Sequence, residues 1–169
     1  ITGDHAVTAK AIGDELGLSK GQLLTLGLCN VALTVPARIF VGMALDRWGP
    51  RRTYGAILVV SAIPNTAFAL SQTFGQMVVS RLAVGVVGAG FVVGIRMVSE
   101  WFPPAEVGSA EGLYGGWGNF GAAAATLVLP VLAATIGGDA GWRWAVALTG
   151  VMAAGYGLVY LRTVTDTPD

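Results

Sequence analysis

Long apolar stretches with very few charges are the feature that most limits how this chain can fold. Five of them cover residues 22–45, 53–71, 76–99, 108–135 and 144–161. Their lengths are close to or above the roughly 20 residues that an α-helix needs to cross the hydrocarbon core of a membrane. Only 12% of the residues are charged, whereas about 25% is usual in a soluble domain. The sequence therefore predicts an all-α membrane protein of about five transmembrane helices joined by short turns.

Basic residues are divided unevenly between the predicted turns. Successive spans reverse direction, so the turn at 46–52, the turn at 100–106 and the tail after residue 162 should share one side. Cytoplasmic loops carry an excess of lysine and arginine, and this side is therefore predicted to be cytoplasmic. It carries Arg47, Arg51, Arg52 and Arg162, against Lys10, Lys20 and Arg143 on the other side. Tryptophans, which are typical of membrane interfaces, stand at the predicted span ends as Trp48, Trp101, Trp142 and Trp144.

The remaining composition disfavours several classes of function. Ten basic and ten acidic residues give a formal net charge of zero, so no nucleic-acid partner is expected. One cysteine, Cys29, and one histidine, His5, leave no intrachain disulfide and too few ligands for a usual zinc site. No Asp or Glu stands at the centre of a predicted span, so no carboxylate proton relay is visible. We expect no cofactor, no metal and no enzyme activity.

The turn at 46–52 combines glycines and charges in a regular pattern. Residues 42–52 read GMALDRWGPRR, which fits G-x-x-x-D-R-x-G-x-R-R. Glycine permits a tight turn between two helices, and an aspartate can pair with arginines to hold one conformation. A simple basic loop is the alternative. The full spacing resembles the loop between the second and third helices of the major facilitator superfamily, which implies structural or gating roles for Gly42, Asp46, Arg47, Gly49, Arg51 and Arg52.

The span at 76–99 carries an arginine and several small residues. Arg81 and Gly85 resemble the R-x-x-x-G segment of the fourth helix of the same superfamily. Gly85, Gly88 and Ala89 make a smooth face that allows another helix to approach closely. Arg81 could extend to the outer membrane interface, and a structural role and a functional role are both open for it. Near the end of this span, Arg96 and Glu100 are one helical turn apart and are predicted to pair.

The span at 108–135 is unusually rich in glycine. Residues 112–121 read GLYGGWGNFG, with five glycines in ten positions. Each glycine costs about 1 kcal/mol of helix propensity in water, but it exposes backbone to another helix or to a small ligand. A glycine-rich packing helix is the plain alternative. Residues 115–121 resemble the G-G/A-x-G-N-x-G signature of the nitrate/nitrite porter family, and residues 94–125 resemble the nitrate permeases of cyanobacteria and related bacteria.

Arg38 is the only charge in the span at 22–45. A charge at the centre of a membrane helix costs at least about 2.5–3.5 kcal/mol, so it should face a cavity, a partner or a ligand. Arg38 precedes Asp46 by eight residues, which puts it roughly 12 Å from the cytoplasmic edge and too deep to extend easily to the interface. Phe91 and Asn119 fall at similar depths of roughly 13–15 Å. All three lie near the midplane, where such transporters bind substrate.

These three side chains suit a small planar anion. A guanidinium can bind two oxygens at once with matched planar geometry, an aromatic ring can stack on the flat face, and an amide can donate a hydrogen bond. In the nitrate/nitrite porter family the matching positions contact substrate. The resemblance therefore implies that nitrate or nitrite is bound by Arg38, Phe91 and Asn119, together with Gly116 and Gly118. Packing against lipid or the protein core remains the alternative for Phe91.

The resemblance also implies an overall organisation. The chain would be helices two to six of a twelve-helix transporter, most of its N-terminal half, embedded in lipid as a multi-pass protein of the bacterial inner membrane. The C-terminal half would be its partner and would supply a second arginine. The two halves would alternate access to the anion site without changing the anion chemically. Another small-anion or organic-anion carrier of the superfamily is the nearest alternative, and a non-transporting membrane assembly subunit is a more distant one.

Overall fold

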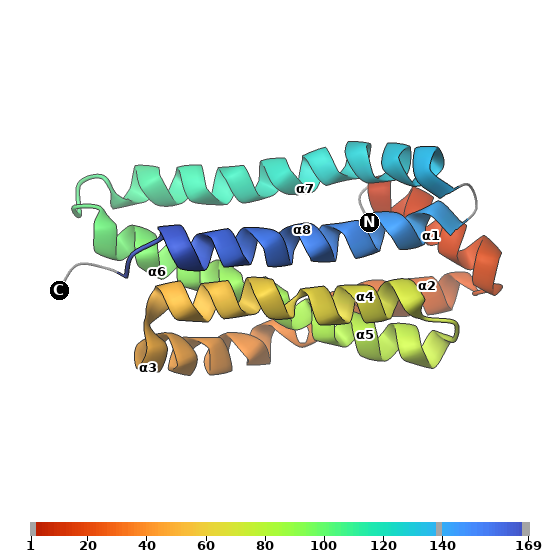
Figure 1. Ribbon diagram of the computed structural model, residues 1–169, viewed down its shortest axis with the longest axis horizontal. Helices are drawn as coiled ribbons and strands as arrows, with labels where there is room; N and C mark the ends of the chain where they lie inside the picture. Colours follow the sequence, from red (N-terminus) through yellow and green to blue (C-terminus); the bar gives the residue numbers. More distant parts are fainter. Residues whose placement is uncertain (1–2, 138–139, 167–169) are drawn as a thin grey trace.

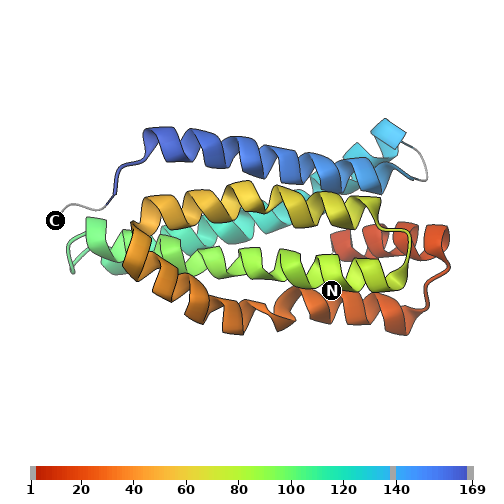
Figure 2. The ribbon, with the colours of Figure 1, turned by 60° about the horizontal axis from the view of Figure 1, so that its bottom comes forward.

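The structure is a computed structural model that describes residues 3–137 and 140–166. Its helices run back and forth along one long axis (Figures 1 and 2). No strand occurs in the described part of the chain, so the prediction of an all-α fold is confirmed. The elements are α1 (Gly3–Leu16), α2 (Lys20–Ala32), α3 (Thr34–Val60), α4 (Ala62–Leu70), α5 (Phe74–Val87), the 3₁₀ turn η1 (Gly88–Gly90), α6 (Phe91–Trp101), α7 (Val107–Gly137) and α8 (Gly141–Thr163).

Four helical stretches within the described residues are long and apolar enough to cross a membrane. The first, Lys20–Leu70, has 51 residues and would be about 77 Å long if it were straight. It is not straight, because at Gly49 the backbone adopts φ 76° and ψ 166° and the chain turns back (Figure 1). The reversal falls inside the predicted turn at 46–52. The other three stretches are Phe74–Trp101, Val107–Ile136 and Gly141–Thr163, and the division into five separate membrane passes remains a prediction.

Prolines explain two further interruptions. Proline lacks an N–H group, and its ring clashes with the carbonyl of the residue four positions earlier in a helix. α2 ends at Ala32, four residues before Pro36, and α3 ends at Val60, four residues before Pro64. The first two predicted spans are therefore each built from two shorter helical segments.

Glycines permit close helix crossings at several points. A Cβ at Gly85 of α5 would lie 2.5 Å from the carbonyl oxygen of Asn30 on α2. A Cβ at Gly157 of α8 would lie 2.8 Å from the Cβ of Leu58 on α3. Both distances are shorter than any side chain tolerates, so only glycine lets these helices pack as they do.

At one end of the bundle, the turn at 46–52 contacts the segment that follows α8. The backbone N–H of Arg51 donates to Asp166 Oδ1 at 3.1 Å, and its guanidinium donates to the carbonyl oxygen of Leu161 at 3.0 Å. The connection between α6 and α7 lies at the same end (Figure 1). The predicted grouping of these three segments on one side is thus confirmed. This end is called the Gly49 end below, and the opposite one the Ser71 end.

Arg143 joins three segments at the Ser71 end. Its guanidinium donates to the carbonyl oxygens of Ala69 and Ser71, at 2.6 and 2.7 Å, and to Glu15 Oε1 at 2.9 Å. The first two acceptors belong to the C-terminal end of α4, where helix carbonyls lack partners within the helix. Arg143 lies in the first turn of α8, and residues 138–139 of the connection predicted at 137–143 lie outside the described residues.

Trp142 lies in the first turn of α8, at a predicted span end, and is buried within the bundle. Its side chain is 2% exposed and packs edge-on against Phe68, with ring centroids 5.9 Å apart. Burial is possible because the indole N–H donates to Glu15 Oε2 at 2.6 Å, which satisfies its one polar group. The other tryptophans at predicted span ends are exposed, namely Trp48, Trp101 and Trp144.

Replacing Arg143 with alanine should destabilise the fold by about 2–3 kcal/mol, because charge-assisted hydrogen bonds to partly buried acceptors would be lost. Thermal unfolding in detergent should show a clearly lower Tm. Arg162→Ala is the matched control, since Arg162 is exposed in the last turn of α8 and has no partner within the described residues. Equal Tm values for the two variants would contradict the role given to Arg143.

Candidate functional site

Arg38 lies in the second turn of α3 and is exposed. Its neighbours Ala37 and Val41 are buried in one cluster with Ala89 and Val93. The face of α3 that carries Ala37 and Val41 therefore packs against the helical stretch that carries Phe91. Arg38 itself has no ion pair and no side-chain hydrogen bond within the described residues. A guanidinium without a partner in an apolar helix is costly in a membrane.

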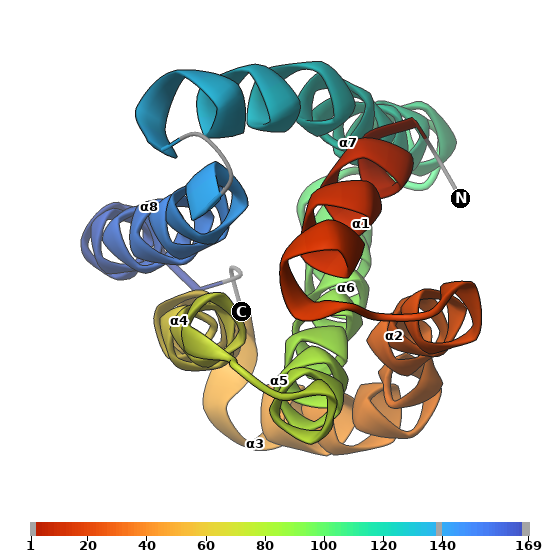
Figure 3. The same ribbon diagram turned by 90° about the vertical axis from the view of Figure 1, so that its right-hand side faces the viewer.

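Phe91 is the first residue of α6, directly after the 3₁₀ turn η1. Its ring stacks on that of Tyr114 from α7, with centroids 5.2 Å apart and planes 26° apart. The side chain is nevertheless 44% exposed. α6 packs against both α3 and α7 (Figure 3). Phe91 therefore lies on a helix between the one that carries Arg38 and the one that carries Asn119.

Asn119 is exposed on α7. Its amide donates one hydrogen bond, to the carbonyl oxygen of Gly115 at 3.0 Å, which leaves a second N–H without a partner in the described part of the chain. A Cβ at Gly116 or Gly118 would meet no atom within 4 Å, and the same holds for Gly42 of α3. Within the described residues, no helix packs on these glycines of α7, in contrast to Gly85.

The structure brings these side chains to neighbouring helices but not into mutual contact. No described hydrogen bond or ring contact joins Arg38, Phe91 and Asn119 to one another. Two of them lie near a change in helix type, since α3 begins at Thr34 and α6 begins at Phe91. The backbone at Leu33 and around the 3₁₀ turn η1 keeps right-handed helical φ and ψ angles. The helical stretches therefore continue through both places, in agreement with the predicted spans at 22–45 and 76–99.

The charges of the 46–52 turn are arranged differently from the pairing expected within the loop. Asp46 accepts a hydrogen bond from Arg96 of α6 at 2.6 Å, and Arg96 also pairs with Glu100 at 2.5 Å, so the predicted Arg96–Glu100 pair is confirmed. Arg47 and Arg52 are exposed and have no partner within the described residues. Because the side chains of Asp46 and Arg96 are 66% and 48% exposed, solvent screens their attraction. The pair joins α6 to the segment just before the reversal at Gly49 and contributes little to the stability of the fold.

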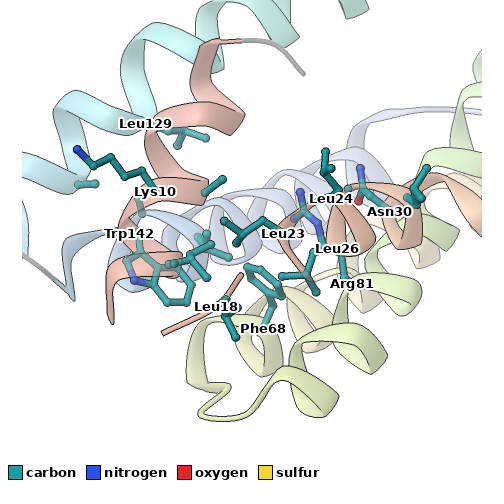
Figure 4. Close-up of a pocket in the computed structure, with 18 of the residues that line it drawn as sticks. Lys10, Leu18, Leu23, Leu24, Leu26, Asn30, Phe68, Arg81, Leu129 and Trp142 are labelled. Atoms are coloured by element: carbon teal, nitrogen blue, oxygen red, sulfur yellow. The ribbon is translucent and has the colours of Figure 1, made fainter. Parts of the chain in front are cut away.

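A cavity of about 1280 Å³ opens near the Ser71 end and is lined by residues of α1, α2, α4, α5, α7 and α8 (Figure 4). None of the three predicted anion-binding side chains lines it. Arg81 does, with its guanidinium 5.1 Å from the ring centroid of Phe68, and Lys10 lies across the cavity from it in Figure 4. Arg81 thus points into the bundle instead of toward the outer interface.

Long apolar helices that run back and forth between two ends of the bundle define a multi-pass helical membrane protein. A family model described as Major Facilitator Superfamily matches residues 5–169. The chain belongs to this family.

Several relatives match nearly the whole chain. It is 56% identical over 169 residues to the nitrate/nitrite transporter NrtP of Nostoc punctiforme, covering 98% of the chain and 34% of the relative. It is 48% identical over 184 residues to the nitrate/nitrite transporter NrtP of a Picosynechococcus species, covering 95% of the chain and 34% of the relative. It is 32% identical over 171 residues to a probable sulfoacetate transporter, SauU, of Cupriavidus necator, covering 97% of the chain and 37% of the relative. The chain thus spans about a third of the length of the curated relatives it matches.

Proposed function

We propose that this chain is part of a transporter that carries nitrate or nitrite across the bacterial inner membrane by alternating access. The observation that carries the proposal is Arg38, an arginine without a partner among the described residues in an apolar helix. Two relatives that share about half of its residues are named nitrate/nitrite transporters, which supports this substrate over the organic anion of the more distant relative.

The proposed site matches the shape and charge of the anion. Nitrate is flat and carries one negative charge over three oxygens. Two parallel N–H groups of Arg38 can donate to two of these oxygens. The ring face of Phe91 that is not stacked on Tyr114 can lie on the anion plane, and the second N–H of Asn119 can donate to the third oxygen. One arginine neutralises one anion, which limits the cost of removing the charge from water.

The remaining part of the site belongs, in this proposal, to a C-terminal half that faces α7. The open glycine face of α7 and the length of the relatives support this arrangement. A backbone without side chains at Gly116 and Gly118 would let the other half, or the anion, approach the main chain closely. The 46–52 turn would then lie on the cytoplasmic side, where its exposed arginines fit the positive-inside rule.

The proposal is tested by expressing the full-length gene in a bacterium that lacks nitrate uptake. We expect accumulation of nitrate and nitrite, with sulfoacetate as a weak competitor. Uptake of sulfoacetate without uptake of nitrate or nitrite, by protein that reaches the membrane, would reject this substrate and favour an organic-anion carrier of the same family.

Gly118→Ala should reduce nitrate uptake without reducing stability. Its Cβ meets nothing within the described residues, and alanine favours a helix over glycine by roughly 0.5–1 kcal/mol. Tm in detergent should therefore stay the same or rise slightly. Uptake should fall, because the added methyl group would occupy space that the proposed site leaves for the anion or for the other half of the transporter. Normal uptake by this variant would remove Gly118 from the anion site.

A further inference from the structure

Tyr114 is not one of the proposed anion-binding residues, but its ring contacts one of them. It lies on α7, one and a half turns before Asn119, and its ring stacks on Phe91 of α6. Phe91 thus has one face covered by a ring from another helix, while its side chain stays 44% exposed. On the continuous helical stretch Phe74–Trp101, the residues three positions before and after Phe91 are Gly88 and Gly94. Neither has a side chain that could pack on the Phe91 ring, and Tyr114 supplies such a contact.

Gly94 makes this stack possible. A Cβ at Gly94 would lie 2.0 Å from the hydroxyl oxygen of Tyr114 and 2.1 Å from its Cζ. The phenol therefore lies directly over the backbone of α6, less than one helical turn beyond Phe91. The Tyr114 ring is therefore confined by the backbone at Gly94 and by the stacked ring of Phe91.

Other rings hold the neighbouring helices in the same register. Tyr54 of α3 lies against Gly90, where a Cβ would be 3.3 Å from its Cε2. Its ring meets that of Tyr160 edge-on, with centroids 5.2 Å apart. The Tyr160 hydroxyl donates to Met97 Sδ of α6 at 3.0 Å. Aromatic side chains from α3, α7 and α8 therefore contact η1 and α6, and Tyr114 is the one that stacks on Phe91.

We propose that Tyr114 is a positioning residue that fixes the ring of Phe91, so that its free face is presented to a flat anion. The proposal rests on the proposed function, because it gives the Phe91 ring an anion to contact. Its consequence concerns specificity. Nitrate is planar and can lie flat on a ring, whereas chlorate, of similar size and the same charge, is pyramidal. A ring held at a fixed angle favours the planar anion, and a ring free to turn loses that preference.

The test compares nitrate and chlorate uptake by the full-length transporter and its variants, at matched amounts of protein in the membrane. Tyr114→Leu should raise the KM for nitrate roughly two- to tenfold, the range expected for one aromatic pair. The maximal rate should change little, and the preference for nitrate over chlorate should fall. Tyr114→Phe keeps the ring and should restore both the KM and the preference.

Gly94→Ala tests the same contact without removing the ring, because its Cβ displaces Tyr114. It should shift KM and preference in the same direction, so the proposal stays testable if Tyr114→Leu fails to reach the membrane. The control is Phe120→Leu, which removes another stacked pair of α7, Trp117 with Phe120 at 5.3 Å. Among the described residues, Phe120 makes no ring contact with Phe91. It should leave KM and preference unchanged.

Two results would overturn the proposal. One is an unchanged KM and preference in both Tyr114→Leu and Gly94→Ala while the unaltered protein takes up nitrate, which would leave the proposed function intact. The other is an equal loss of preference in Phe120→Leu. Absence of nitrate uptake by the unaltered, folded protein would overturn the proposed function and this inference together.

Discussion

Arg38→Lys is expected to raise the KM for nitrate about tenfold to hundredfold, the effect of losing one charge-assisted hydrogen bond. Lysine keeps the positive charge but presents a point charge instead of a planar pair of N–H groups. The lysine variant should still attract the anion, but it should no longer bind two of its oxygens through paired N–H groups. Uptake measured over a range of nitrate concentrations separates this effect on KM from an effect on protein amount.

Arg162→Lys is the matched control for this substitution. Arg162 is an exposed arginine near the end of α8, and its replacement should leave the KM unchanged. An unchanged KM for Arg38→Lys as well would mean that the guanidinium shape is not used, and the planar-anion argument would fail even if transport itself needs a positive charge.

Gly85→Ala is expected to destabilise the bundle by about 2–3 kcal/mol. Its Cβ would meet backbone atoms, 2.5 Å from the carbonyl oxygen of Asn30 and 3.3 Å from that of Cys29, so α2 and α5 would have to separate. The Thr34 hydroxyl donates to the Gly85 carbonyl oxygen at 2.9 Å and more weakly to that of Asn30 at 3.4 Å, and the shorter of these bonds between α3 and α5 would be lost. This overpacking exceeds the helix propensity that alanine gains.

Gly75→Ala provides the comparison on the same helix. A Cβ there meets nothing within 4 Å, so its Tm in detergent should equal or slightly exceed that of the unaltered protein. Similar Tm values for Gly85→Ala and Gly75→Ala would show that the close crossing of α2 and α5 does not stabilise the fold.

Much of the fold could be predicted because hydropathy and turn signals are local properties of the sequence. The reversal at Gly49 follows from a glycine next to proline and arginines. The breaks after Ala32 and Val60 could also have been placed from Pro36 and Pro64, by the clash four residues earlier. Partners far apart in the sequence could not be predicted. Trp142 is buried because Glu15, 127 residues away, accepts its N–H.

The candidate site could likewise be predicted only in part from the sequence. Arg38 is evident in the sequence because a single charge in an apolar span is costly. Depth along a helix follows from counting residues, but rotation about the helix axis does not, so the sequence could not decide which of the three side chains share a face. It also missed Tyr114. The only signal was a glycine at 94 in one span and a large aromatic residue at 114 in the next, and that pairing requires the register between α6 and α7.

The central claim is that a guanidinium at position 38 binds the transported anion. Its most direct test reconstitutes the purified full-length protein in lipid vesicles and measures uptake of isotope-labelled nitrate by the unaltered protein and by Arg38→Ala. We predict saturable uptake that nitrite inhibits in the first case, and uptake no greater than that of empty vesicles in the second. Equal, saturable nitrate uptake by the folded Arg38→Ala protein would contradict the account.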